Sequence, residues 1–124
     1  MVKVFAALGG AFAMLSVACG AFGAHALRAR LDERALEVWE TAASYQMYHG
    51  LGLLAVAWIL AQTQSTAATV AGWAMVVGVV VFSGSLYTLS LTGIKWLGAI
   101  TPIGGVAFIV AWIALIVAAT GLEG

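Results

Sequence analysis

The chain has 124 residues, of which 64% are hydrophobic and 8% charged, and its formal net charge at pH 7 is zero. Soluble domains carry about 25% charged residues, so this composition excludes an ordinary soluble domain. A neutral chain also offers no electrostatic case for nucleic acid binding, and the length favours a single domain.

Four long uncharged runs dominate the sequence. A bilayer core about 30 Å thick is crossed by about 20 helical residues, and backbone polar groups in lipid must pair within each segment, which favours helices. The sequence therefore predicts an all-α integral membrane four-helix bundle, one transmembrane domain over residues 1–124. The expected spans are residues 4–24, 41–61, 67–91 and 96–120.

The first run also resembles a secretory signal peptide, because Lys3 precedes it and Ala24–Ala26 could serve as a cleavage site. The run has about 21 residues, whereas the apolar region of a signal peptide has about 7–15. We therefore expect it to be retained as the first membrane helix.

Two stripes with helical spacing run along this first helix. The bulky stripe contains Phe5, Leu8, Phe12, Leu15, Cys19 and Phe22, and the small stripe contains Gly9, Ala13, Ser16, Gly20 and Gly23. Small residues let membrane helices approach closely. We expect Gly9, Ala13, Gly20 and Gly23 to pack against a neighbouring helix. The alternative is that glycine is merely common in membrane helices.

The connection after the first span is charged, with seven of the ten charged residues between Arg28 and Glu40. Asp32 suits a helix N-cap, and Glu33 suits the first helical turn. We expect a short amphipathic helix between the first two spans, with Trp39 at headgroup level. The alternative is that this segment forms the extended start of the second helix.

The second span carries a polar face, although it lies within an apolar run. At 100° per residue, Tyr45, Gln46 and His49 share one side, and the opposite side is formed by Met47, Leu51, Leu54 and Trp58. Polar groups facing lipid would be unpaired, so the polar face is expected to point inward. Its expected partners are Ser16, Ser83 and Tyr87. This set either forms a satisfied network that fixes helix register, or lines a ligand or proton site with His49 as its titrating member.

The last two spans add a helix bend and an orientation. Pro102 removes one backbone hydrogen bond, so a kink is expected there. Lysine and arginine favour the cytoplasmic side. The loops after the first and third spans contain four such residues, and the opposite side contains only Lys3, so both termini are expected outside. The four are Arg28, Arg30, Arg34 and Lys95.

Residues for cofactor or metal chemistry are sparse. The two histidines are expected at different depths, with His25 at the interface and His49 roughly 12 Å deeper, which disfavours a shared haem or metal. Cys19 belongs to the bulky stripe, and no carboxylate lies nearby in the membrane. No phosphate-binding loop or catalytic triad pattern is present. We expect no catalytic residue, metal site or cofactor.

Four motifs occur in an order that resembles one family. They are GAFGAH (Gly20–His25), WETAASYQMYH (Trp39–His49), FSGSLYTLSLTG (Phe82–Gly93) and TPIGG (Thr101–Gly105). They resemble domain of unknown function 423, a group of small membrane proteins whose animal members are called transmembrane protein 256. The resemblance implies a multi-pass protein of the bacterial inner membrane, or of an organelle membrane in eukaryotes. It implies no established activity and transfers no catalytic residue.

Three classes of function are compatible with this sequence. We expect a structural or accessory membrane component, in contact with the bilayer and packing with itself or with a membrane complex. The alternative is binding or transport of a small lipophilic or polar molecule in a cavity between helices around His49. A membrane enzyme would need several titratable groups at one depth, and only His49 qualifies, so no enzymatic activity is expected.

Overall fold

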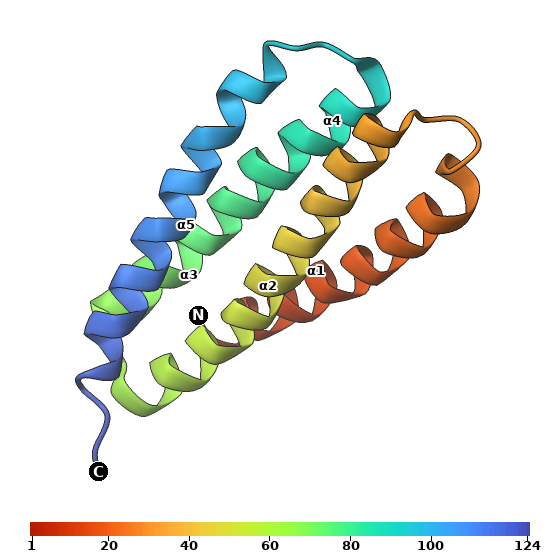
Figure 1. Cartoon of the computed structure of the whole chain (residues 1–124). Coiled ribbons are helices and arrows are strands. Elements are labelled where there is room, and N and C mark those ends of the chain that lie inside the picture. Colours follow the sequence, from red (N-terminus) through yellow and green to blue (C-terminus); the bar gives the residue numbers. More distant parts are fainter.

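The computed structural model describes residues 1–124 and contains helices without strands. Four helical segments alternate in direction, so that both termini lie at the same end of the molecule (Figure 1). Two of these segments include a short π-helix, labelled η. In chain order the elements are α1 (Val2–Phe22), η1 (Gly23–Leu27), α2 (Glu33–Thr63), α3 (Thr66–Gly78), η2 (Val79–Ser83), α4 (Gly84–Thr92) and α5 (Leu97–Ala119).

Three of the four segments are long and apolar enough to cross a membrane, by length and composition: Val2–Leu27, Thr66–Thr92 and Leu97–Ala119. This confirms the all-α class and agrees with three of the expected spans. The remaining helix, α2, is not among them. It contains the polar face described above, and twelve of its 31 residues are buried within the bundle. Its membrane crossing stays a prediction.

The charged connection does not form a helix of its own. The structure has a short loop ending at Asp32, whose Oδ1 accepts a hydrogen bond from Ala35 N at 2.7 Å, and α2 then begins at Glu33. No glycine or proline interrupts the chain until Gly50, so nothing breaks the helix between its charged start and its apolar part. The expected separate amphipathic helix is therefore not confirmed, and the segment is the extended start of α2.

Short turns with local caps join the other helices. Gln64 adopts a left-handed conformation with φ of 50° and ends α2, and the Ser65 side chain then accepts a hydrogen bond from Ala68 N at 3.1 Å to begin α3. Gly93, with φ of 71°, ends α4 in the same way. Glycine tolerates this conformation without steric cost, which is common at the end of a helix.

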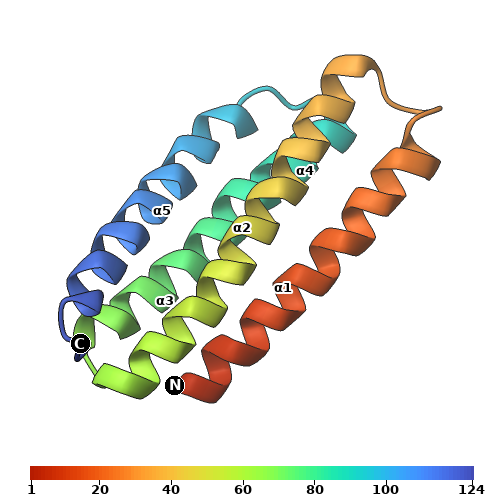
Figure 2. The ribbon, with the colours of Figure 1, turned by 60° about the horizontal axis from the view of Figure 1, so that its bottom comes forward.

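The helix α2 occupies the middle of the bundle. It packs against α1 on one side and against α3, η2 and α4 on the other, and α5 packs mainly against that second group (Figures 1 and 2). The outer helices α1 and α5 consequently present large apolar faces outward. The most exposed side chains there are Met14, Val17, Ile103, Ile109 and Ile116.

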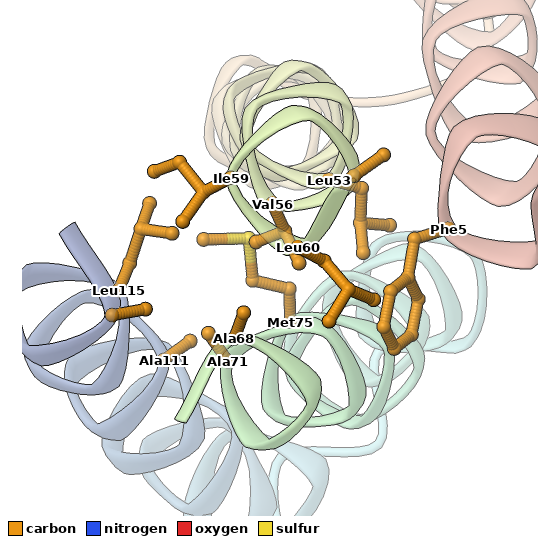
Figure 3. Packing of buried hydrophobic residues seen from close by; sticks show 12 residues of the cluster. Phe5, Leu53, Val56, Ile59, Leu60, Ala68, Ala71, Met75, Ala111 and Leu115 are labelled. Carbon is orange, nitrogen blue, oxygen red and sulfur yellow. The ribbon is translucent and has the colours of Figure 1, made fainter. Parts of the chain in front are cut away.

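The apolar core lies in the half of the bundle nearer the termini, and Figure 3 shows its side chains from close by. Phe5 from α1 and Met75 from α3 are fully buried there, and the Phe5 ring lies against Gly72 and edge-on to Trp73. The core side chains of α2 in this half are Leu53, Val56, Ala57, Ile59 and Leu60. The opposite half, near the charged connections, contains most of the polar contacts between helices.

Candidate functional site

Hydrogen bonds join α2 to its neighbours on both sides along a line that we call the polar seam: Ser16, Gln46, Ser83 and Tyr87. Ser16 Oγ on α1 donates to the Ala43 carbonyl at 2.6 Å. On the opposite side, Ser83 Oγ of η2 donates to the Ala42 carbonyl at 2.7 Å. Two neighbouring carbonyls of α2 thus each accept a bond from a different helix.

The centre of the polar seam is Gln46, which is 5% exposed. Its Nε2 donates to the Phe12 carbonyl of α1 at 3.0 Å, and its Oε1 accepts a hydrogen bond from Tyr87 Oη of α4 at 2.7 Å. One side chain therefore links three helices. The structure thus brings Gln46 and Tyr87 together. Ser16 and Ser83 bind the carbonyls of Ala43 and Ala42, which lie about one turn before Gln46 on α2.

Two further residues extend the same line and were not assigned to it from the sequence. Trp39, placed at headgroup level by the sequence analysis, is buried and donates from Nε1 to the Cys19 carbonyl at 2.7 Å. Ser90 Oγ donates to the Ala35 carbonyl at 2.7 Å. In the sequence, Gly23 was the signal for the buried position of Trp39. A Cβ at Gly23 would lie 2.5 Å from the Trp39 ring, so only glycine leaves room for the indole.

His49 lies outside the polar seam, in contact with α5. Its Nδ1 lies 2.7 Å from the Tyr45 carbonyl, and Trp112 Nε1 donates to its Nε2 at 3.0 Å. A carbonyl and an indole N–H leave one consistent assignment, with the imidazole proton on Nδ1 and the Nε2 lone pair accepting. Both ring nitrogens are thereby engaged, so coordination of a metal or haem would require one of these bonds to break.

An aromatic cluster surrounds His49 and consists of Tyr45, Phe82, Phe108 and Trp112. The His49 ring stacks on Phe108 with centroids 3.5 Å apart and an interplanar angle of 8°. These residues line a groove of about 500 Å³ between α2, η2 and α5. Gly78 and Gly104 allow this approach, because a Cβ at Gly78 would lie 2.4 Å from Phe108 and one at Gly104 would lie 2.5 Å from the Phe82 backbone nitrogen.

The expected inward direction of the α2 polar face agrees with two of its three residues. Gln46 and His49 are buried, whereas Tyr45 is 38% exposed and stacks on Phe82 at the edge of the groove. Tyr45 also lies 6.2 Å from the Phe108 ring of α5, measured between centroids, so its exposed part borders the groove between α2 and α5. On the opposite face, Leu51, Leu54 and Trp58 are exposed and Met47 is partly buried.

The packing face of α1 differs from the expected small stripe. The residues of α1 turned toward the rest of the bundle alternate between the two stripes: Phe5, Gly9, Phe12, Ser16, Cys19 and Gly23. A Cβ at Gly9 would lie 2.7 Å from the Gly50 carbonyl oxygen, but one at Gly20 would meet nothing within 4 Å. Ala13 remains near the contact through its backbone nitrogen. Gly20 therefore does not belong to the interface, and Phe5 does not face lipid.

Two other sequence expectations concern Pro102 and His25. The helix α5 continues through Pro102, which lines the aromatic groove, and the bend itself stays a prediction. His25 is exposed in η1, and it takes no part in the hydrogen bonds of His49 with Tyr45 and Trp112. No group of three or more His, Cys, Asp or Glu residues is arranged to hold a metal ion.

Comparison with known proteins identifies one family. The protein-family model described as "Protein of unknown function (DUF423)" matches residues 19–105. A UPF0382 membrane protein of Staphylococcus epidermidis is 50% identical over 98% of this chain and 99% of its own length. The UPF0382 membrane protein YwdK of Bacillus subtilis is 52% identical over 94% and 96%, and one from Staphylococcus saprophyticus is 55% identical over 93% and 95%. No solved structure matches the chain.

Proposed function

The chain belongs to this DUF423 family of membrane proteins, and we propose that it acts as a structural or accessory component that packs with itself or with a membrane complex. One observation carries the proposal: every buried side-chain nitrogen or oxygen has a hydrogen-bonding partner within the chain. Buried polar groups that are fully paired stabilise a unique helix arrangement, and none is left to bind a polar substrate.

The distribution of titratable groups supports a role without catalysis. Acid–base or nucleophilic catalysis needs groups that converge on one point with a free donor or acceptor. The only buried histidine, His49, has both nitrogens engaged, and the charged residues of α2 lie at its exposed start. We therefore propose that the bundle performs no reaction of its own.

We further propose four membrane crossings in the bacterial inner membrane, with α2 as the fourth span and both termini outside. Both termini lie at one end of the bundle in Figures 1 and 2, as an even number of crossings requires. A periplasm-specific reporter fused to Gly124 should be active, whereas activity only from a cytoplasmic reporter would reverse the topology. The end of the bundle opposite the termini has four basic residues, Arg28, Arg30, Arg34 and Lys95, whereas the end with the termini has only Lys3. This difference supports the proposed orientation, because basic residues favour the cytoplasmic side.

Cysteine cross-linking in native membranes tests self-assembly. With Cys19→Ser as the background, single cysteines at Val17 on α1 and Ile109 on α5 sample the two exposed outer faces. Oxidation should give a covalent dimer from one face and not from the other. Native mass spectrometry in mild detergent should then show a homo-oligomer or a defined protein partner, and a monomer without cross-links or partners would contradict the proposal.

The second candidate function is binding of a small molecule around His49. The observation in its favour is the groove of about 500 Å³ lined by Tyr45, Phe82, Phe108 and Trp112. Flat aromatic walls would suit a lipophilic ligand. A molecule retained in native mass spectrometry and lost on Phe108→Ala would favour this function. If His49→Gln keeps assembly but loses the cellular phenotype, a ligand or proton site is also favoured over a purely structural role.

A further inference from the structure

A second hollow lies at the end of the bundle opposite the termini, between the start of α2 and the end of α4. It has a volume of about 510 Å³. Three basic side chains and one acidic side chain line it, with an apolar wall and the buried Ser90 beneath. The basic residues are Arg30, Arg34 and Lys95, the acidic residue is Asp32, and the apolar wall consists of Leu31, Ala35, Val38 and Leu89.

The basic side chains of this hollow are poorly neutralised. Asp32 already accepts the capping hydrogen bond from Ala35 N. The only ion pair in the structure joins Arg34 to Glu37 at 3.5 Å, and both side chains are exposed, which makes such a pair weak. Arg30 and Lys95 form no ion pair. A phosphate group could therefore replace water between these two cations.

Apart from Asp32, the acidic residues of the same region line other hollows. Glu33, Glu37 and Glu40 follow one another at helical spacing along α2 and line separate hollows beside η1 and Tyr48. The start of α2 consequently has an acidic side and a basic side, and the basic side faces the end of α4. This separation leaves a local positive field over the hollow although the chain is neutral.

The hollow also lies level with the ends of the candidate spans, where lipid headgroups are expected. The candidate spans Val2–Leu27 and Thr66–Thr92 end beside it, and Leu97–Ala119 begins beside it. Its wall of Leu31, Val38 and Leu89 continues from the basic rim toward the membrane. Basic pockets between membrane helices bind anionic headgroups. A soluble phosphate would use the rim alone, whereas a lipid would also use the wall.

We propose that this hollow binds an anionic phospholipid, with the headgroup phosphate between Arg30 and Lys95 and the start of an acyl chain along Leu31, Val38 and Leu89. Arginine offers paired N–H donors to phosphate oxygens, and lysine adds a mobile charge. The site is independent of the role proposed for the bundle, because lipid binding there neither requires nor excludes a protein partner.

Lipid titration of the purified full-length protein tests the proposal. Phosphatidylglycerol should bind more tightly than phosphatidylcholine with the same acyl chains, measured by native mass spectrometry. Arg30→Gln/Lys95→Gln should weaken phosphatidylglycerol binding about 25-fold, since each interfacial cation contributes about 5-fold. Lys3→Gln/Arg28→Gln removes the same charge outside the hollow and should leave binding unchanged.

Further arms separate the site from folding and from free phosphate. Arg30→Lys/Lys95→Arg keeps both charges and should retain the lipid, and Lys95→Glu alters one exposed loop residue and should lose it with unchanged helix content. Wild-type affinity in Arg30→Gln/Lys95→Gln or Lys95→Glu would overturn the proposal, as would equal losses in the Lys3→Gln/Arg28→Gln control. Glycerol 3-phosphate that binds as tightly as phosphatidylglycerol would overturn the lipid assignment.

Discussion

Toward the termini, α2 contacts its neighbours through apolar side chains such as Leu53 and Val56, which pack on Phe5 and Met75 (Figure 3). Toward the charged connections, α2 instead contacts α1 and α4 through hydrogen bonds, with Gln46 bound to both. Lipid tails are as apolar as leucine, so apolar contacts in a membrane depend on close fit. Hydrogen bonds have definite donors and acceptors. Close packing therefore stabilises one half of the bundle, and polar pairing sets the helix register in the other.

Phe5→Ala should have the largest effect, because it empties the centre of the apolar half. The fully buried ring leaves a cavity against Gly72, and we expect a loss of about 3 kcal/mol in the free energy of unfolding, the lower end of the range for a buried phenylalanine. Titration with sodium dodecyl sulfate in mixed micelles measures it. Phe22→Ala, at a half-exposed position, is the matched control, and equal losses in both variants would contradict the placement of Phe5.

Gly9→Leu should be next, because Gly9 lies against the α2 backbone at Gly50. A side chain there must force the two helices apart, and overpacking costs about 1–3 kcal/mol. The same titration should show little change for Gly20→Leu, where a Cβ meets nothing within 4 Å. Greater damage from Gly20→Leu would restore the small stripe expected from sequence spacing and refute the observed face of α1.

Gln46→Leu should have a smaller effect, although it removes two hydrogen bonds between helices. Such bonds average about 0.6 kcal/mol each in a membrane protein, so a loss of about 1–2 kcal/mol is expected once the unpaired Tyr87 hydroxyl is included. Gln62→Leu, at an exposed position, is the control. A double-mutant cycle with Tyr87→Phe should show coupling, and additive losses would indicate that the two side chains do not interact.

His49→Gln should have the smallest effect of the four. It weakens the bond from Trp112 and the stacking on Phe108, and one such bond is worth about 0.6 kcal/mol. The exposed His25→Gln is the control. If His49→Gln destabilised the protein more than Phe5→Ala, the polar contacts rather than the apolar core would dominate stability, and the comparison between the two halves would fail.

The sequence was sufficient to predict the all-α class and the four long helical segments, although the separate amphipathic helix that it also predicted is not confirmed. Uncharged runs of membrane-spanning length allow few alternatives, because a backbone in lipid must satisfy its own polar groups. Angular spacing along α2 was also sufficient to place Gln46 and His49 on one side, away from Leu51 and Trp58, and burial of that side agrees. These inferences depend on geometry within one helix, which local sequence controls.

The neighbour that each helix face meets depends instead on the tertiary packing of the bundle. Spacing along α1 defines angles between its own residues but not the direction of α2, so the contact face came to combine Phe5 and Phe12 with Gly9 and Ser16. The partner of His49 lies 63 positions away at Trp112, and its bond exists because α5 packs close to η2. Contacts between helices depend on how the whole set packs, and no single helix contains that information.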